Sequence, residues 1–161
     1  MIRMNKDTAV NLVDFLPEAA IQPDLKSHAK KEVLKELVQA LSSAHGIKDS
    51  ANILEALLER EELGSTGIGQ GIAIPHGKSD SVSGVVAALG ISKRGIDFDA
   101  LDGEPVHIFF MLIAPSNSAG IHLKILAKIS RLLKDKFFRQ ALREAKTSRD
   151  ALKLIKDENE Y

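Results

Sequence analysis

His76 lies within the most glycine-rich stretch of the chain, where residues 64, 67, 69, 71 and 77 are all glycine. Glycines leave backbone N–H groups uncovered, and such groups bind anions well where the chain curls around them. An imidazole is nucleophilic at neutral pH without an activating base, and a phosphoryl group on its nitrogen needs N–H donors and cations nearby. The stretch therefore indicates a covalent phosphohistidine at His76. A turn-rich hairpin that carries a surface histidine is the alternative on spacing alone.

The two common phosphate-binding loop motifs do not fit this stretch. A Walker A loop requires G-x-x-x-x-G-K-[ST], but Ile72 stands where the first glycine would have to precede Gly77, Lys78 and Ser79. The dinucleotide motif G-x-G-x-x-G also fails, because the third glycine is again replaced by Ile72. A nucleotide-binding loop of either kind is therefore not expected.

The same residues carry a resemblance to a known family. Glu61, six spacers, Ile68-Gly69, two spacers and then Ile72-Ala-Ile-Pro-His76-Gly resemble the signature of the mannitol/fructose-type enzyme IIA domains of the bacterial sugar phosphotransferase system. That family includes nitrogen-regulatory members. Segments 60–69, 96–106 and 121–127 are also similar to segments of the family, so the resemblance covers about residues 10–157.

The resemblance implies a function for His76. It would accept a phosphoryl group from the phosphohistidine of the carrier protein HPr and pass it on, usually to a cysteine of an enzyme IIB domain. The chain has no cysteine and no room for a second domain, so we expect any IIB acceptor on a separate chain and the protein to be a free-standing relay or regulator. No cofactor and no metal are expected.

Three functions compete. The first expectation is a nitrogen-regulatory-type IIA protein, which binds regulatory target proteins according to its phosphorylation state. The alternative is the IIA component of a fructose- or mannitol-type sugar permease. A non-catalytic binding module that keeps the fold without the chemistry is the second alternative, and the presence of Arg60, His76 and His122 argues against it.

Two further side chains and several loop residues complete the predicted site. Arg60 matches the family arginine near the active histidine, and a guanidinium offers a phosphoryl group paired N–H donors. The same position in the last turn of a predicted helix also suits a cation that complements the helix dipole. His122 matches the second histidine of the family site and shares a helical stripe with Ile125 and Ile129, as a packed core histidine also would. The loop residues expected to bind the phosphoryl group are Ser65, Thr66, Gly67, Gly69, Gly71 and Gly77.

Isoleucines around the predicted site are expected to help a carrier protein dock. Ile68, Ile72 and Ile74 would form an apolar ring around His76, with charges at its rim controlling the approach.

The remaining histidines and cations are assigned no role. His28 and His45 lie at the ends of a predicted helix, and His107 begins a predicted strand, where its ring should find a backbone partner. A zinc site made of His76, His107 and His122 is disfavoured, because the chain has no short ligand pair such as H-E-x-x-H. Cations recur between residues 124 and 146, and we interpret them as a solvated helix face, since aromatic residues are almost absent among them.

The elements that must position these residues follow from apolar spacing. One helix is predicted over 29–41, between an N-cap at Ser27 and a stop at Gly46. A second is predicted from a cap at Asp49 to a stop at Gly64, with an apolar face over 53–58 and Arg60 in its last turns. A short strand is expected at 72–75, and the continuous apolar runs 85–91 and 106–114 are typical of strands covered on both faces. Helical spacing returns at 121–133, 137–145 and 149–155. This order predicts an α/β fold, a single domain with a central mixed β-sheet flanked by helices on both faces.

Chain length and net charge limit the number of domains and the kinds of partner that can be expected. The 161 residues amount to one domain, 1–161, at roughly 150 residues per domain. Twenty-two Lys and Arg against 22 Asp and Glu give no net charge, which removes the bulk attraction for nucleic acid or anionic lipid. Residues 1–8 lack the apolar core of a signal peptide, and no window approaches a membrane span, so we expect no membrane insertion and a cytoplasmic location.

Overall fold

The computed structural model describes residues 10–159, so the expectation for residues 1–8 lies outside the described part. The described chain opens with two 3-10 turns, η1 (Leu12–Asp14) and η2 (Glu18–Ala20), and strand β1 (Ile21–Gln22). Next come helices α2 (Lys30–His45) and α3 (Ser50–Glu62), the short strands β2 (Gly67–Gly69), β3 (Ile72–Ala73) and β4 (His76–Lys78), and the long strands β5 (Val86–Ile96) and β6 (Val106–Ala114). Helices α4 (Ala119–Leu132), α5 (Lys136–Glu144) and α6 (Ser148–Asn159) complete it.

The strands form one mixed sheet of six, in the order β1-β5-β6-β3-β2, with β4 also beside β6. Strands β5 and β6 run antiparallel, whereas β1 is parallel to β5, and β3 and β4 are both parallel to β6. Strand β3 pairs with β6 at Ile108 and Phe109, and β4 pairs with it further along, from Leu112. The chain between residues 72 and 78 therefore follows one side of β6 and brings His76 to the far end of that strand.

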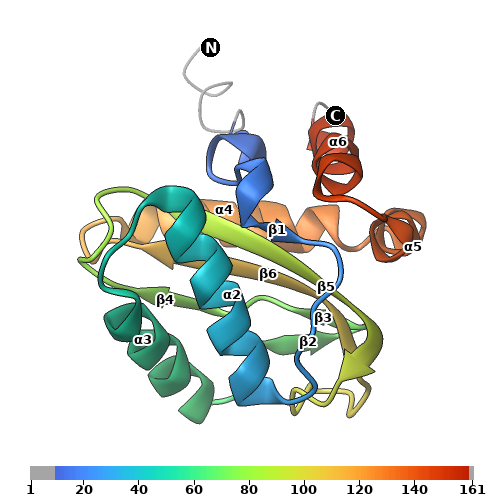
Figure 1. Ribbon diagram of the computed structural model, residues 1–161, viewed down its shortest axis with the longest axis horizontal. Helices are drawn as coiled ribbons and strands as arrows, with labels where there is room; N and C mark the ends of the chain where they lie inside the picture. The colour runs from blue at the N-terminus through green and yellow to red at the C-terminus, as the bar shows by residue number, and fades with distance from the viewer. Residues whose placement is uncertain (1–9, 160–161) are drawn as a thin grey trace.

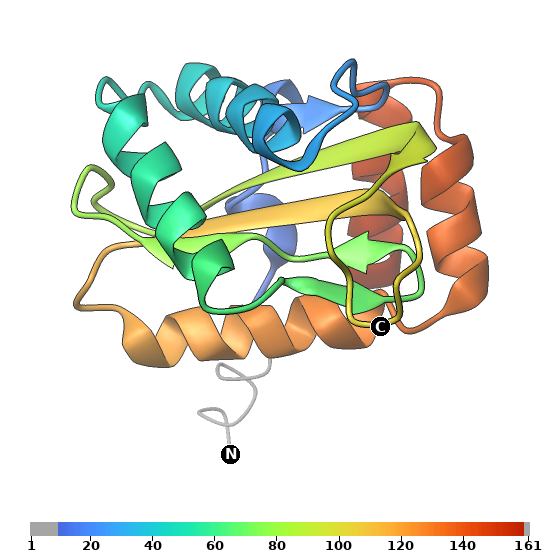
Figure 2. The ribbon, with the colours of Figure 1, turned by 90° about the horizontal axis from the view of Figure 1, so that it is seen from below.

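Helices cover both faces of this sheet. Figures 1 and 2 show α2 and α3 on one face and α4 on the other. Helix α3 packs on β4, α2 packs on β5, and α5 contacts β5 and β6. The predicted α/β fold with a central mixed sheet is therefore confirmed.

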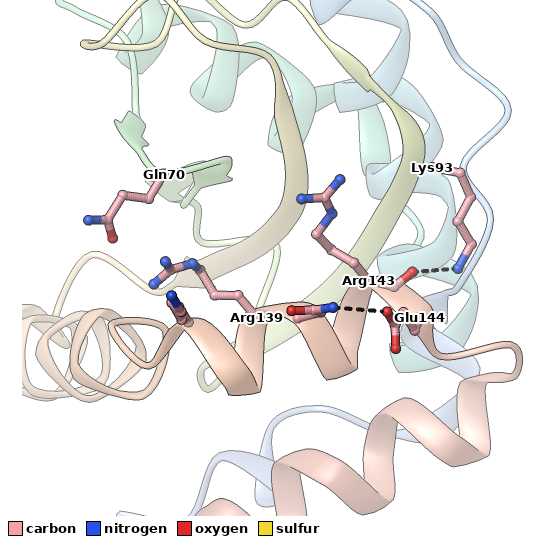
Figure 3. A pocket seen from close by; sticks show the side chains of 7 residues that line it. Gln70, Lys93, Arg139, Arg143 and Glu144 are labelled. Carbon is pink, nitrogen blue, oxygen red and sulfur yellow. Dashed lines mark hydrogen bonds between the residues drawn. The ribbon is translucent and has the colours of Figure 1, made fainter.

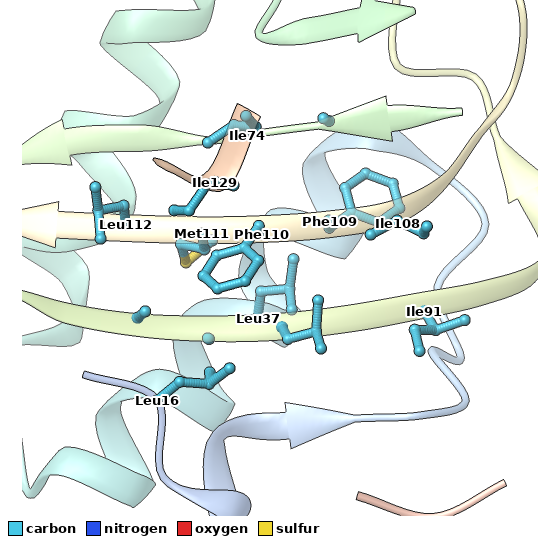
Figure 4. Packing of buried hydrophobic residues seen from close by; sticks show 14 of the residues in the cluster. Leu16, Leu37, Ile74, Ile91, Ile108, Phe109, Phe110, Met111, Leu112 and Ile129 are labelled. Atoms are coloured by element: carbon cyan, nitrogen blue, oxygen red, sulfur yellow. The ribbon is translucent and has the colours of Figure 1, made fainter. Parts of the chain in front are cut away.

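The core explains why β6 carries almost no polar residue. Both of its faces are covered, and every residue from Ile108 to Ala114 is buried, as expected for a strand between two helix layers. Figure 4 shows β6 side chains packed with Leu37 of α2, Ile129 of α4 and Ile74. This core holds the strand beside which β4 lies.

The structure also differs from the sequence-based expectations. Ser27 is not the N-cap of α2, which begins at Lys30 after Ala29; the Ser27 hydroxyl instead donates to Glu36 at 2.7 Å. Asp49 caps α3 as predicted, by accepting the Asn52 N–H. Strand β1 was not expected, because two residues are too short for a periodic signal. Over residues 10–159, no helix is both long and apolar enough to cross a membrane.

Candidate functional site

The imidazole of His76 is held by its own backbone. Its Nδ1 lies 2.7 Å from the carbonyl oxygen of Ile74, and a carbonyl oxygen can only accept a hydrogen bond. Nδ1 therefore carries the proton and donates it, and Nε2 is left with its lone pair in the neutral ring. The carbonyl is fixed in turn, because the N–H of Ile74 donates to Thr66 and Pro75 accepts from Leu112 of β6.

Burial keeps His76 neutral. The half-buried ring loses hydration when it is charged, and this lowers its pKa below the usual value. The hydrogen bond to Ile74 opposes this shift, the positive charge of Arg60 adds to it, and the negative charge of Glu61 opposes it. The balance is a lowered pKa, so His76 presents an uncharged, nucleophilic Nε2 near neutral pH.

His122 lies beside His76. It occupies the first turn of α4, the residue is 5 % exposed, and the two rings meet edge to face with centroids 5.6 Å apart. Burial lowers its pKa, and the nearby charges of His76 and Lys78 lower it further. Its Nε2 is buried and has no hydrogen-bond partner within residues 10–159. A buried ring nitrogen without a partner is costly, which is consistent with a group that is paired only when the site is loaded.

Arg60 lies in the last turn of α3, where it binds a backbone carbonyl. Arg60 donates from Nη1 to the carbonyl oxygen of Gly64 at 2.9 Å, which suits the helix-end cation. Its positive charge also contributes to the lowered pKa of His76. Arg60 can therefore serve both the helix end and an anion on His76.

Glu61 organises the loop that leads to His76. Its buried carboxylate accepts hydrogen bonds from the Thr66 N–H, at 3.2 Å, and from the Thr66 hydroxyl. Lys30 of α2 pairs with it at 3.0 Å and also lies 4.7 Å over the ring of Phe98. Sequence reasoning assigned Glu61 no role; its place in the family signature was the available signal.

The structure separates the loop residues that the sequence grouped. The Ser65 hydroxyl donates to Phe98 and accepts from Gly67, and the Thr66 hydroxyl donates to Glu61. These hydroxyls are thus engaged within the protein, and their role as phosphoryl ligands stays a prediction without structural support.

The glycines of the loop also lie apart. Gly67 packs against Ala100, Gly69 lies near Asp102 and Gly71 near His107, all away from β4. Gly77 adjoins His76 and faces α3. A Cβ added at Gly77 would lie 3.6 Å from Ala56, so the absence of a side chain there lets α3 lie close to β4. Of the predicted loop set, only Gly77 adjoins His76 in β4.

The expected apolar ring around His76 is not formed, because two of its three members are buried and the third, Ile68, lies in β2 between Gly67 and Gly69, away from β4. Ile72 and Ile74 are 2 % and 4 % exposed, because β3 and the segment after it belong to the core. Ile68 is 46 % exposed. Other apolar residues are exposed: Leu63 follows α3, and Ile121 and Leu123 flank His122 on α4.

The remaining histidines lie elsewhere. His107 Nδ1 donates to Ser92 at 2.9 Å, as expected of a strand histidine with a backbone partner. His28 lies 3.1 Å from an Arg94 nitrogen and His45 lies 3.2 Å from the Ala87 carbonyl. His107 is at the opposite end of β6 from Leu112, the partner of His76. Over the described part of the chain, no three His, Asp or Glu side chains are grouped as metal ligands.

Comparison with known proteins agrees with this architecture. The family described as "Phosphoenolpyruvate-dependent sugar phosphotransferase system, EIIA 2" matches residues 14–158. The nitrogen regulatory protein of Bradyrhizobium diazoefficiens is 41 % identical over 140 residues, 87 % of this chain and 89 % of that protein. The fructose-specific EIIABC component of Bacillus subtilis is 39 % identical over 143 residues, 89 % of this chain and 22 % of that protein.

A solved structure gives the same result in three dimensions. The crystal structure of nitrogen regulatory protein IIA-Ntr from Neisseria meningitidis superposes with a TM-score of 0.83 and 33 % identity, over 89 % of this chain and 98 % of that one. The chain therefore belongs to the EIIA 2 family of the phosphoenolpyruvate-dependent sugar phosphotransferase system.

Proposed function

We propose that this protein is a phosphocarrier that accepts a phosphoryl group on Nε2 of His76 from the phosphohistidine of an HPr-type carrier. It then acts as a free-standing IIA protein of the nitrogen-regulatory type. The observation that carries the proposal is the 2.7 Å hydrogen bond from Nδ1 to Ile74. This bond leaves Nε2 with the lone pair that would attack phosphorus. The ring centroids of His76 and His122 are 5.6 Å apart.

The transfer is a simple displacement at phosphorus. Nε2 of His76 attacks in line as the P–N bond to the carrier imidazole breaks, and the electron pair of that bond stays on the carrier. The proton on Nδ1 remains donated to Ile74, so this hydrogen bond stabilises the positive charge that phosphorylation places on the ring. Because donor and product are both phosphohistidines, the protein's task is to orient the attack and spread charge over three oxygens.

The neighbours of His76 suit a dianionic product. Arg60 can offer a guanidinium fork and Lys78 an ammonium, while the unpartnered Nε2 of His122 can donate once it carries a proton. The first amides of α4, from Ala119 onward, also lack partners within the helix, and its dipole favours negative charge there.

Similarity to nitrogen regulatory proteins supports the proposed regulatory function. The nitrogen regulatory protein of Bradyrhizobium matches over most of both chains. The alternative, a IIA component that passes the group to a IIB cysteine on another chain, rests on fructose-specific relatives. The EIIABC component of Bacillus subtilis is matched over 22 % of its length, and the EIIA component of Haloferax volcanii, 40 % identical, over 77 % of its length.

Phosphorylation of the purified protein tests the proposal. Incubation with phosphorylated HPr should add the mass of one phosphoryl group, labile in acid, to the wild type and to His28→Gln, and nothing to His76→Gln. Heteronuclear NMR of the product should place phosphorus on Nε2. Full uptake by His76→Gln, or phosphorus on Nδ1, would overturn the assignment.

A second measurement separates the two family functions. Phosphorylated protein should retain its label when mixed with a fructose-type IIB domain, and phosphorylation should change its affinity for target proteins isolated on the unphosphorylated form. Rapid discharge to the IIB cysteine would favour the permease alternative. No uptake from HPr at all would favour a binding module.

A further inference from the structure

A basic pocket lies away from the two histidines. Figure 3 shows it between the turn that carries Gln70, the strand that carries Lys93 and one side of helix α5. Its volume is about 450 Å³, which is in the range of small-molecule sites. The side chains that line it are Gln70, Lys93, Lys136, Arg139, Gln140, Arg143 and Glu144.

This pocket is separate from the proposed phosphoryl site. Arg143 contacts His107 near the start of β6, whereas His76 pairs with Leu112 near the end of that strand. The spacing of residues in a strand puts roughly 16 Å between those two positions. A molecule bound in this pocket would therefore not contact His76.

The charges of the pocket are not balanced. Four cationic side chains face one carboxylate, Glu144, which accepts a hydrogen bond from Gln140 at 3.3 Å. Within residues 10–159, none of the four cations forms an ion pair with a carboxylate. The chain as a whole has no net charge, so the excess is local and attracts anions.

Two of the cations are already held in place by backbone carbonyls. Lys93 donates to the carbonyl oxygens of Arg143 and Ala145, at 2.7 and 3.0 Å. Arg139 donates from Nη1 to the carbonyl oxygens at the end of α4, at 2.8 and 2.7 Å. Carbonyls fix these groups without neutralising them, so the positive charge is preorganised at little further entropic cost.

The other two cations, Arg143 and Lys136, donate no side-chain hydrogen bond to a backbone carbonyl within residues 10–159. Arg143 lies 3.4 Å from Nε2 of His107, which must accept because Nδ1 donates to Ser92. Lys136 lies over the exposed ring of Phe137. Positions 136, 139 and 143 share one face of a short helix, where like charges repel one another and weakly destabilise the helix. A bound anion would relieve this repulsion. This face was expected to be merely solvated.

We propose that this pocket binds a small phosphorylated metabolite. Arg143, Arg139 and Lys136 would contact the phosphoryl oxygens, and the guanidinium forks suit that geometry. The amides of Gln70 and Gln140 supply both donors and acceptors for the uncharged part of the ligand. The turn at Gln70 and helix α5 form opposite sides of the pocket. This enclosure suits a compact ligand better than an extended nucleic acid.

Pyrophosphate is the probe that tests this site. Calorimetry on the unphosphorylated full-length protein should show saturable binding of one pyrophosphate, and amide shifts should map to residues 70, 93 and 136–144. Arg143→Gln and Lys136→Gln should each raise Kd at least tenfold, whereas Lys153→Gln on α6 should stay within twofold of wild type. Circular dichroism and the melting temperature establish that each variant is folded.

Further binding measurements, with a His76 variant and with competing ligands, test the proposed ligand class. His76→Gln should bind pyrophosphate as wild type does, so this result is independent of the proposed phosphoryl transfer. Citrate binding more tightly than pyrophosphate, or displacement of pyrophosphate by a single-stranded oligonucleotide at lower concentration, would overturn the proposed ligand class. The absence of saturable binding at millimolar pyrophosphate, or an unchanged Kd in both glutamine variants, would overturn the site.

Discussion

The rings of His76 and His122 lie edge to face at 90°, with their centroids 5.6 Å apart. Burial lowers the pKa of both, and a charge on His76 lowers the pKa of His122 further. The resting pair is therefore neutral near pH 7, because two imidazolium ions at this distance would repel in a partly desolvated site. The proposed phosphoryl group on His76 would change this balance, because its negative charge favours the charged form of His122.

The first prediction concerns His122 as a partner of the phosphoryl group. His122→Gln should fold normally and take up phosphoryl groups from HPr about 10- to 100-fold more slowly, since a hydrogen bond to a charged group contributes about 1.5–3 kcal/mol. Quenched-flow kinetics measure the rate, and His28→Gln on the surface is the matched control. If the glutamine variant transfers at the wild-type rate, His122 is a packing residue only.

Phosphorylation should also raise the pKa of His122. A dianion beside the ring favours the imidazolium form and so opposes the burial that now lowers this pKa. NMR titration of the imidazole protons before and after phosphorylation measures the shift, with exposed His28 as the internal reference. Identical titration curves in the two states would contradict the proposed contact.

Arg60→Lys tests the two tasks of the arginine. An ammonium can still donate to the Gly64 carbonyl, so the free energy of unfolding should change by less than about 1 kcal/mol. It cannot present two parallel donors, so phosphoryl transfer should slow by about tenfold or more. Chemical denaturation and transfer kinetics are measured together, with Arg94→Lys as the control. Unchanged kinetics would leave Arg60 as a helix-end cation alone.

Two glycines of the predicted loop should respond differently to alanine. A Cβ at Gly67 would lie 2.9 Å from the Cα of Ala100, so Gly67→Ala requires a backbone shift and should lower the free energy of unfolding by about 1–3 kcal/mol. A Cβ at Gly77 meets Ala56 at 3.6 Å, an ordinary contact, so Gly77→Ala should be nearly neutral. Urea denaturation compares them. Equal losses would show that the close approach of Ala100 does not constrain Gly67.

Stability should depend on pH through the two histidines. Their folded pKa values lie below the usual value of about 6.5. Below that pH the unfolded chain binds protons that the folded chain does not, so the free energy of unfolding falls as the pH drops through about 6.5 and is level above it. Each histidine contributes a slope of at most about 1.4 kcal/mol per pH unit.

Denaturation at pH 5 to 8 checks this dependence. The double variant His76→Gln with His122→Gln should lose most of the slope, whereas His28→Gln should keep it. The carboxyl pKa values of Asp80 and Asp102 are lowered by hydrogen bonds, so their effects belong to a more acidic range. A slope that survives in the double variant would assign the dependence to other groups.

Sequence patterns located most of the elements because those signals are local. Helical spacing predicted α2 to α6, and an unbroken apolar run predicted β6, since a strand covered on both faces tolerates few polar side chains. Strand β5 extends to Ile96, beyond the predicted end at Ile91, because its last residues pair again with β6 after an irregularity. No spacing rule reports such long-range pairing.

The sequence by itself determined which residue types could do chemistry: a histidine among glycines, an arginine before them and a second histidine on a helical stripe. Only the tertiary structure decided that Nδ1 of His76 carries the proton and that Nε2 keeps its lone pair, because this depends on the Ile74 carbonyl at 2.7 Å. Only the tertiary structure separated Gly67 from the neighbourhood of His76 and brought the α5 cations opposite Gln70. The physical reason is that tautomer, packing and pocket each depend on atoms that the folded backbone brings together, at distances that residue order does not encode.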